Sequence, residues 1–266
     1  MSQFLEPNCG YPDISPKIMH GQNAENGTNP WMAYIFKYND KEVAELVCGG
    51  TLIHKLLFHT NRNIFIMLNF LKSSAVRLGE HSSSRYFAVT KAFRNKYFTT
   101  GSYSNDIGIL RIQPIVKFNA VIRPICIITD PTKVPNVKTF KAAGWGKTEN
   151  ETFSKVLKTV ELNELNASEC YNMLWVNVTE SQICAGHPDG DTCAGDSGGP
   201  LIHPVYMDGS LRYVQLGIIS FGSSLCNSPG VYTRLSSFID WILMVVDNYT
   251  VRSPPKIQYR VWPYGK

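Results

Sequence analysis

The sequence lacks any long hydrophobic run. Its longest apolar stretch, Ile64–Leu71, is interrupted by Asn69 and is too short to cross a bilayer. The start of the chain, Met1–Pro7, has no apolar segment of the kind that a signal peptide requires. A dense basic run is also absent, since 26 Lys and Arg stand against 21 Asp and Glu. These absences exclude a helix that spans a membrane and argue against nucleic-acid binding, which needs a clustered basic surface.

The cysteines and the potential glycosylation sequences point to an oxidising environment. Seven cysteines are many for a cytosolic protein, where thiols stay reduced, and odd in number for a secreted one. Asn-x-Ser/Thr sequences can accept N-glycans in an extracellular protein. We therefore expect a secreted glycoprotein whose N-terminus is truncated. These sequences begin at Asn26, Asn150, Asn166, Asn177 and Asn248.

Short strand-like segments dominate the chain between two polar ends. β-Branched and aromatic residues recur with glycine between them, which favours short strands joined by tight turns. Two helices are predicted, one from a cap around Asn166–Ser168 to Leu174 and one over Ser236–Asp247, where apolar residues share a face. Residues 1–17 are predicted to be a linker and residues 248–266 a surface tail. The clearest predicted strands are Trp31–Phe36, Val47–Ile53, Asp106–Ile112 and Tyr213–Ser220.

The segment Asp191–Pro200, which reads DTCAGDSGGP, carries the most chemical information. Ser197 is a candidate nucleophile, and the glycines around it let backbone N–H groups surround an oxyanion. The segment resembles the active-site loop of chymotrypsin/trypsin-like serine proteases. Further markers of that family follow in family order along residues 9–247. They are Lys17–Gly21, Pro30–Trp31, Cys48–Leu52, Asn105–Leu110, Gly144–Gly146 and Pro229–Arg234.

The resemblance implies an all-β fold of two six-stranded antiparallel barrels with a C-terminal helix. Residues 18–247 would form the protease domain, with the active site in the crevice between the barrels. The Cys9-Gly10 pair ahead of a linker is similar to the secreted, zymogen-type branch that includes clip-domain proteases.

The resemblance also implies a role for each residue near the serine. Ser197 would be the nucleophile, the N–H groups of Gly195 and Ser197 the oxyanion hole, and Asp106 the acid that orients a catalytic histidine. Asp191 occupies the position of the floor of the S1 pocket, where a carboxylate pairs with Arg or Lys of a substrate. Three further residues would bind substrate: Ser220 at a strand edge, and Gly222 and Gly230 as open pocket walls.

The same resemblance implies a zymogen switch and a set of disulfides. Cleavage after Lys17 by an upstream trypsin-like protease would free the amino group of Ile18, which would pair with Asp196 and order the oxyanion hole. The Cys9–Cys126 disulfide would keep the released peptide attached. The other implied pairs are Cys170–Cys184 and Cys193–Cys226, which leaves Cys48 unpaired.

One part of the family pattern is missing. After Cys48–Ile53 the family continues into a strand and then Ala-Ala-His-Cys, which supplies the general base and the cysteine that bonds back to the first one. The family spacing places this histidine near Asn63, where the sequence has no His-Cys pair. His59 is a weak substitute because it comes too early, within an apolar strand. A replaced segment therefore explains both the absent base and the unpaired Cys48.

No metal or other cofactor is expected. The histidines lack metal-ligand spacing, and few acids follow Glu80, which resembles the start of a calcium loop. Two interpretations of function remain open. One is a trypsin-like endopeptidase that cleaves after Arg or Lys but is inactive as written, and the other is a non-catalytic homologue that acts as a secreted binding or regulatory protein in a protease cascade. In both, the partners are proteins with exposed Arg or Lys, and neither a nucleic acid nor a membrane is expected.

Overall fold

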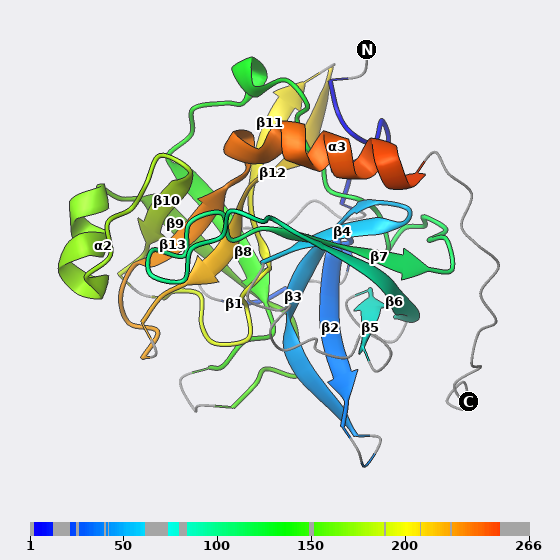
Figure 1. The fold of residues 1–266 in the computed structure, drawn as a ribbon, viewed down its shortest axis with the longest axis horizontal. Helices are drawn as coiled ribbons and strands as arrows, with labels where there is room; N and C mark the ends of the chain where they lie inside the picture. Colours follow the sequence, from blue (N-terminus) through cyan, green and yellow to red (C-terminus); the bar gives the residue numbers. More distant parts are fainter. Residues whose placement is uncertain are drawn as a thin grey trace.

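The computed structural model describes residues 3–12, 22–24, 27–39, 41, 43–61, 74–79, 84–148, 152–188, 190–207, 209–223 and 225–250. This part of the chain forms two β-barrels, with the C-terminal helix lying across one end of the pair (Figure 1). The predicted activation residues Lys17 and Ile18, and the position near Asn63 where the family has its histidine, lie outside the described residues.

The first barrel is a closed ring of six antiparallel strands. In ring order these are β2 (Met32–Tyr38), β3 (Ala44–His54), β4 (Leu57–Thr60), β7 (Gly108–Gln113), β6 (Arg85–Arg94) and β5 (Ser74–Leu78). Alternate residues such as Val76 and Leu78 fill its interior, as the two-residue period of a strand requires.

The second barrel is also a closed ring of six strands, because β8 pairs with β9. In ring order these are β9 (Lys158–Glu164), β10 (Gln182–Gly186), β13 (Gly230–Arg234), β12 (Ser210–Phe221), β11 (Pro200–Met207) and β8 (Thr139–Gly144), while β1 (Gln22–Asn23) pairs with β9 from outside the ring. The two antiparallel barrels confirm the predicted fold class.

The two predicted helices are present, with one changed boundary. Helix α2 (Ala167–Leu174) begins after the capping residue Asn166, whose N–H donates to Glu169 Oε1 at 3.1 Å. The second prediction began at Ser236, but the chain first forms the 3₁₀ turn η3 (Leu235–Phe238) and then α3 (Ile239–Thr250). The helix therefore extends into the segment that the sequence analysis assigned to the tail. Within the described part of the chain, no helix has the length and apolarity of a membrane span.

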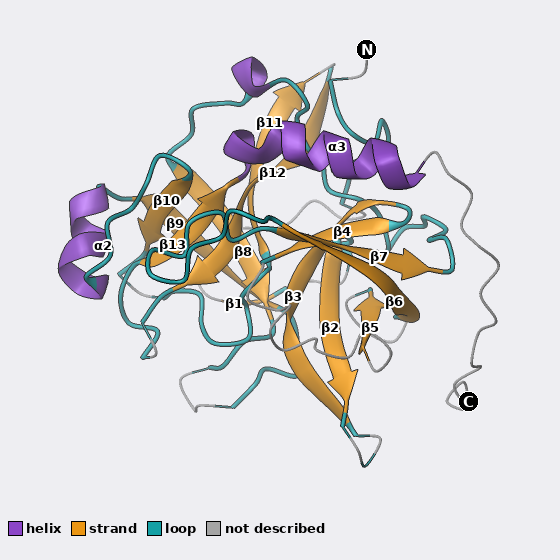
Figure 2. Cartoon of the chain, in the orientation of Figure 1, coloured by secondary structure: helices purple, strands orange, loops and turns teal. Residues whose placement is uncertain are grey.

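A shared apolar core joins the barrels to the C-terminal helix. Ile53 and Ile109 of the first barrel pack in one cluster with Ile218 of the second barrel and with Ile242 and Val245 of α3. Figure 2 shows α3 crossing above strands of both barrels. The helix therefore buries its apolar face against both barrels, which holds them together.

The predicted linker is partly a docked segment. Over residues 3–12, Phe4 and Cys9 are buried in the core cluster of the second barrel. Arg212 Nη1 donates to a main-chain carbonyl of the segment at 2.6 Å, and Glu6 Oε1 lies 3.3 Å from His54 Nε2 of the first barrel. The polar residues and prolines of this segment predicted a linker. They could not indicate the docking, because its contacts are with residues more than 40 positions away in the chain.

The structure contains the three disulfides that the family resemblance implies. They are Cys9–Cys126, Cys170–Cys184 and Cys193–Cys226. Cys48 is free and buried in the first barrel, where desolvation raises the pKa of its thiol well above the usual range. The thiol is thus protonated and shielded from reagents in the folded protein.

Candidate active site

The conformation of the loop that carries Ser197 depends on two glycines and on backbone hydrogen bonds. Gly195 and Gly198 adopt φ angles of +101° and +83°, a region that L-residues rarely occupy. Gly49 N donates to Ser197 O at 3.0 Å, and Gly198 N donates to Ile219 O at 2.8 Å. The loop is therefore fastened to both barrels. The Ser197 side chain is half-buried, and its hydroxyl makes no hydrogen bond within the described part of the chain.

The carboxylate of Asp196 occupies a cradle made by the Gly-Trp-Gly segment. Asp196 Oδ1 accepts a hydrogen bond from Gly146 N at 2.6 Å, and Oδ2 accepts one from Cys193 N at 2.9 Å. A Cβ atom on Gly144 or Gly146 would collide with this carboxylate. Burial raises the pKa of Asp196 to about 6, against the opposing effect of the two N–H donors. A buried carboxylate with this pKa is suited to pairing with a cation.

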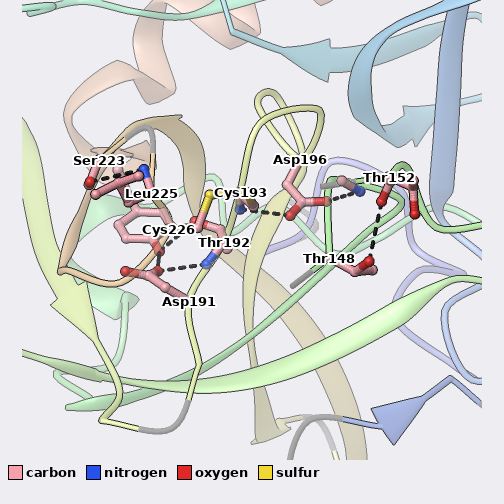
Figure 3. The surroundings of a disulfide bond; sticks show 11 residues. Thr148, Thr152, Asp191, Thr192, Cys193, Asp196, Ser223, Leu225 and Cys226 are labelled. Atoms are coloured by element: carbon pink, nitrogen blue, oxygen red, sulfur yellow. Dashed lines mark hydrogen bonds between the residues drawn. A yellow bond between two sulfur atoms is a disulfide. The ribbon is translucent and has the colours of Figure 1, made fainter. Parts of the chain in front are cut away.

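Asp191, the predicted floor of the S1 pocket, lies near the Cys193–Cys226 disulfide, on the side away from Asp196 (Figure 3). Its Oδ1 accepts hydrogen bonds from Thr192 N at 2.6 Å and from Tyr232 Oη at 3.2 Å. Burial raises the pKa of Asp191 to about 7, and the charge of Asp196 adds to the increase. No ion pair with a cation offsets this burial within the described residues, so the ionised form of Asp191 is stabilised only by hydrogen bonds.

The two glycines predicted to wall the pocket lie opposite each other. A Cβ atom built on Gly222 would come within 3.5 Å of the Gly230 Cα. The two backbones therefore approach each other closely, with no side chain from either glycine between them.

Asp106 is completely buried at the entrance to β7. Ser220 Oγ of β12 donates to Asp106 Oδ2 at 2.6 Å, and Thr233 Oγ1 of β13 donates to the Asp106 carbonyl at 2.9 Å. The predicted triad acid of the first barrel is thus held by two strands of the second barrel. The sequence analysis predicted that Ser220 binds substrate through its backbone. In the structure, its hydroxyl also donates a hydrogen bond to Asp106.

His59 is brought to a place that does not suit a general base. The side chain is fully buried in β4, and neither ring nitrogen has a hydrogen-bond partner among the described residues. Burial lowers the pKa of His59 to about 3, which the nearby Gln215 side chain slightly opposes. A base must reach both solvent or substrate and the proton that it removes, and this imidazole faces the core between the barrels.

The end of β4 lies beside the serine loop. Thr60 Oγ1 donates to Gly49 O at 3.1 Å, and a Cβ atom on Gly198 would approach Asn61 N within 3.1 Å. The chain thus leaves β4 next to the loop of Ser197. The residues that follow Asn61 are those where the family has its histidine, and they lie outside the described part.

The comparisons with known proteins identify the family to which this site belongs. A family model described as Trypsin matches residues 18–242. The chain belongs to the trypsin family. It is 32% identical to "CLIP domain-containing serine protease B15" of Anopheles gambiae, over 91% of this chain and 74% of that protein. It is also 32% identical to "Clotting factor G beta subunit" of Tachypleus tridentatus, over 89% and 82% of the two chains.

A solved structure extends this trypsin-family assignment to the fold. The crystal structure of the drosophila Grass clip serine protease of the Toll pathway is similar with a TM-score of 0.81 and 28% identity. The match covers 92% of this chain and 77% of that chain. The similarity to clip-type serine proteases that the sequence motifs indicated is thereby confirmed.

Several residues that support the trypsin-family site were missed by sequence reasoning. Tyr232 and Thr192 hold the Asp191 carboxylate, and Gly144 and Gly146 make the cradle for Asp196. The glycines were used only as family markers. Two glycines flanking a tryptophan signal a close approach, but the sequence does not reveal which group approaches.

Proposed function

We propose that this chain binds Arg or Lys side chains of protein partners in a protease cascade, and that as written it does not hydrolyse peptides at a useful rate. The observation that carries the proposal is the partly buried Asp191 carboxylate, which Thr192 N and Tyr232 Oη hold by hydrogen bonds. Its pKa of about 7 reflects burial without a cation, and a guanidinium or ammonium group placed there would form a charge-assisted hydrogen bond.

The absence of a recognisable base supports the second half of the proposal. Without a base, the Ser197 hydroxyl stays protonated at neutral pH and is a poor nucleophile. Removal of the histidine from another serine protease lowers turnover about a million-fold. The pocket residues do not depend on that histidine, so we expect recognition to survive where hydrolysis is lost.

Cascade membership and secretion rest on the relatives and the disulfides. Relatives at 33% and 30% identity are named "Proclotting enzyme" and "Melanization protease 1", and these names support a role in a proteolytic pathway. Three disulfides suit an oxidising, extracellular compartment. We further propose that an upstream protease cuts after Lys17 and that the freed Ile18 amino group pairs with Asp196.

The alternative is that the chain is a working endopeptidase with specificity for Arg or Lys. The intact Ser197 loop and the buried Asp106 favour it, because binding alone requires neither of them. This alternative needs a base that comes from outside the described residues. It therefore predicts hydrolysis of an arginyl ester that is abolished by Ser197→Ala.

Calorimetric titration with benzamidine tests the binding proposal. We expect the intact chain, cut after Lys17, to bind this cation, and Asp191→Asn to weaken binding about 100-fold because a buried charge loses its partner. Asp240→Asn, at an exposed acid of α3, serves as the matched control and should bind like the original chain. Equal affinity of both variants for benzamidine would contradict the assignment of Asp191.

A further inference from the structure

The segment that joins helix α2 to strand β10 takes no part in the site described above. It follows α2 at the outer edge of the second barrel (Figure 1). Val176 and Val178 are half-buried, and Val178 packs against a core cluster of this barrel. The residues that alternate with these two valines are exposed: Trp175, Asn177 and Thr179. An extended chain directs alternate side chains to opposite sides, so these three share the outward side.

Trp175 presents a large apolar ring to the surface. At 80% it is the most exposed large apolar side chain of the described residues. Its backbone has φ 57° and ψ 30°, in the left-handed region that bulky residues rarely occupy. Trp175 N donates to Tyr171 O at 2.8 Å and so ends α2, and the two rings lie 6.2 Å apart. An unusual backbone conformation therefore holds an exposed indole beside a second aromatic ring, which calls for a group that covers it.

A candidate for that group is encoded two residues further along the chain. Asn177 begins the sequence Asn-Val-Thr, an acceptor sequence for N-glycans. None of the other four acceptor sequences has an aromatic residue two positions before its asparagine. Two residues of chain span at most about 7 Å, so a sugar linked to the Asn177 amide lies within reach of the Trp175 indole.

The amide of Asn177 is also the least constrained of those that the structure describes. Asn166 caps α2, with its N–H bound to Glu169 Oε1. Asn248 lies in α3, where its Nδ2 donates to Met244 O at 2.8 Å. The Asn177 side chain is exposed and makes no hydrogen bond with any other described residue. Linkage of a sugar to its Nδ2 therefore breaks no contact of the fold.

We propose that Asn177 carries an N-linked glycan whose first N-acetylglucosamine packs on the indole of Trp175. The oligosaccharide is transferred by the glycosylating enzyme of the secretory pathway from a polyprenyl pyrophosphate donor. The bond from C1 of the sugar to the pyrophosphate oxygen breaks, a bond from C1 to Asn177 Nδ2 forms, and Nδ2 loses one proton. The C–H groups on one face of the attached sugar then meet the ring face, which carries partial negative charge.

The glycan explains why the indole is exposed without requiring a second protein. Its apolar face covers the ring, and its hydroxyl groups replace an apolar surface by one that water solvates. A protein partner docked on Trp175 would instead compete with any glycan on Asn177. The proposal rests on the secretion that forms part of the proposed function, but it uses neither Ser197 nor Asp191.

Site-specific mass spectrometry on the full chain, secreted from eukaryotic cells behind an added signal peptide, tests the modification. Enzymatic release of N-glycans in heavy-oxygen water labels each asparagine that carried a glycan. We expect the label at position 177 and its loss in Asn177→Gln. Asn172→Gln, at an exposed asparagine of α2 outside any acceptor sequence, is the matched control and keeps the label at position 177.

Melting temperatures of four secreted chains test the contact with the ring. They are the original chain, Asn177→Gln, Trp175→Ala and the double variant. Loss of the glycan is expected to lower the melting temperature by about 2 °C where the indole is present, and by less than about 0.5 °C where it is absent. Asn172→Gln should melt like the original chain.

The label at position 177, with a loss of melting temperature confined to chains that hold Trp175, supports the proposal. Absence of the label from the secreted chain overturns it and leaves the indole for a protein partner. Equal losses of melting temperature with and without Trp175 overturn the contact between sugar and ring. Benzamidine titration of Asn177→Gln separates this proposal from the proposed function, because failure to bind would count against the Asp191 pocket alone.

Discussion

The two barrels have the same architecture but differ in how much of the protease site each retains. In the second barrel, the serine loop and the Asp191 and Asp196 carboxylates are all held by hydrogen bonds. In the first barrel, Asp106 also accepts hydrogen bonds, but Cys48 is unpaired and the His59 side chain is fully buried. Every disulfide has a cysteine at or beyond residue 126, so none joins two described residues of the first barrel. In the proposed function, the second barrel supplies recognition, whereas hydrolysis needs a base from the first barrel.

The largest expected effect comes from restoring the first barrel's share of the site. Replacing residues 61–64 by Ala-Ala-His-Cys puts a histidine at position 63 and a partner for Cys48 at position 64. With the base present, arginyl-ester hydrolysis by the chain cut after Lys17 is expected to rise by up to about a million-fold. Esterase kinetics measure this rise, and the same graft in a Ser197→Ala background is the control. A correctly folded graft with no gain in activity would mean that the defect lies in the second barrel.

The next largest effect is a change of about 100-fold in the affinity of the second barrel for benzamidine between pH 5 and pH 7. The free Asp191 carboxyl has a pKa of about 7, and a bound cation favours its ionised form. Benzamidine must then displace a proton below that pH, so its affinity is expected to rise about tenfold per pH unit toward pH 7 and then level off. Titrations between pH 5 and 8 measure the slope. A flat profile would show that Asp191 is ionised throughout and that the pocket is less buried than the structure indicates.

The same two acids affect stability with a definite sign. The pKa values of Asp191 and Asp196 are raised in the folded chain to about 7 and about 6. The folded state therefore holds their protons more tightly than the unfolded chain, and stability from this source is lost as pH rises from about 4 to 7. Benzamidine at saturating concentration is expected to reverse the Asp191 part of this loss, which melting curves at several pH values with and without ligand would measure.

The smallest expected effect comes from the polar pair between the barrels. Both ring nitrogens of His59 and the Oε1 of Gln215 are buried without a hydrogen-bond partner among the described residues, and Gln215 keeps one bond, from Nε2 to Gly217 O at 3.1 Å. Replacing both by apolar residues, as His59→Val with Gln215→Leu, is expected to stabilise the fold by about 1 kcal/mol, because unsatisfied polar groups are costly to bury. Because the pKa of His59 is lowered to about 3, the original chain should also lose stability as pH falls from about 6.5, and the double variant should lose less.

Chemical denaturation of the double variant and of each single variant measures this effect. His203→Gln, at a histidine whose Nδ1 lies 2.8 Å from Thr139 O near the surface, is the matched control. Strong destabilisation by the double variant would mean that the pair holds the barrels together instead of weakening them. Loss of arginyl-ester hydrolysis in His59→Val, if the original chain showed any, would make His59 the base after all.

The local features of the fold were predictable from the sequence, and the contacts between distant parts were not. The alternation in Ser74–Leu78 and the cap at Asn166 act over a few residues, so patterns of period two and the capping box indicate them. The hydrogen bond from Ser220 to Asp106 joins residues 114 positions apart, and no periodic pattern in the sequence indicates it. The docking of residues 3–12 is similar, since the burial of Phe4 depends on Ile128, with which it forms a bridge, and on strands of the second barrel.

The site shows the same division. Ser197, Asp191 and Asp196 could be assigned roles because they fall in one short segment that resembles a known family. The position of His59 could not be inferred, because its strand has alternating faces and only the packing of the barrels determines which face meets solvent. The expectation that His59 is a weak candidate for the base rested on its early position and on the apolar strand around it, and the burial of its side chain adds a physical reason.

We expect the chain to bind Arg side chains although it does not hydrolyse the peptide, and a single incubation measures both. The chain, cut after Lys17, is mixed with a fluorescent peptide that contains a single Arg, and anisotropy and product are measured on the same sample. The account predicts a rise in anisotropy that benzamidine reverses and Asp191→Asn abolishes, with the peptide recovered intact. Cleavage after the Arg that disappears in Ser197→Ala would contradict it.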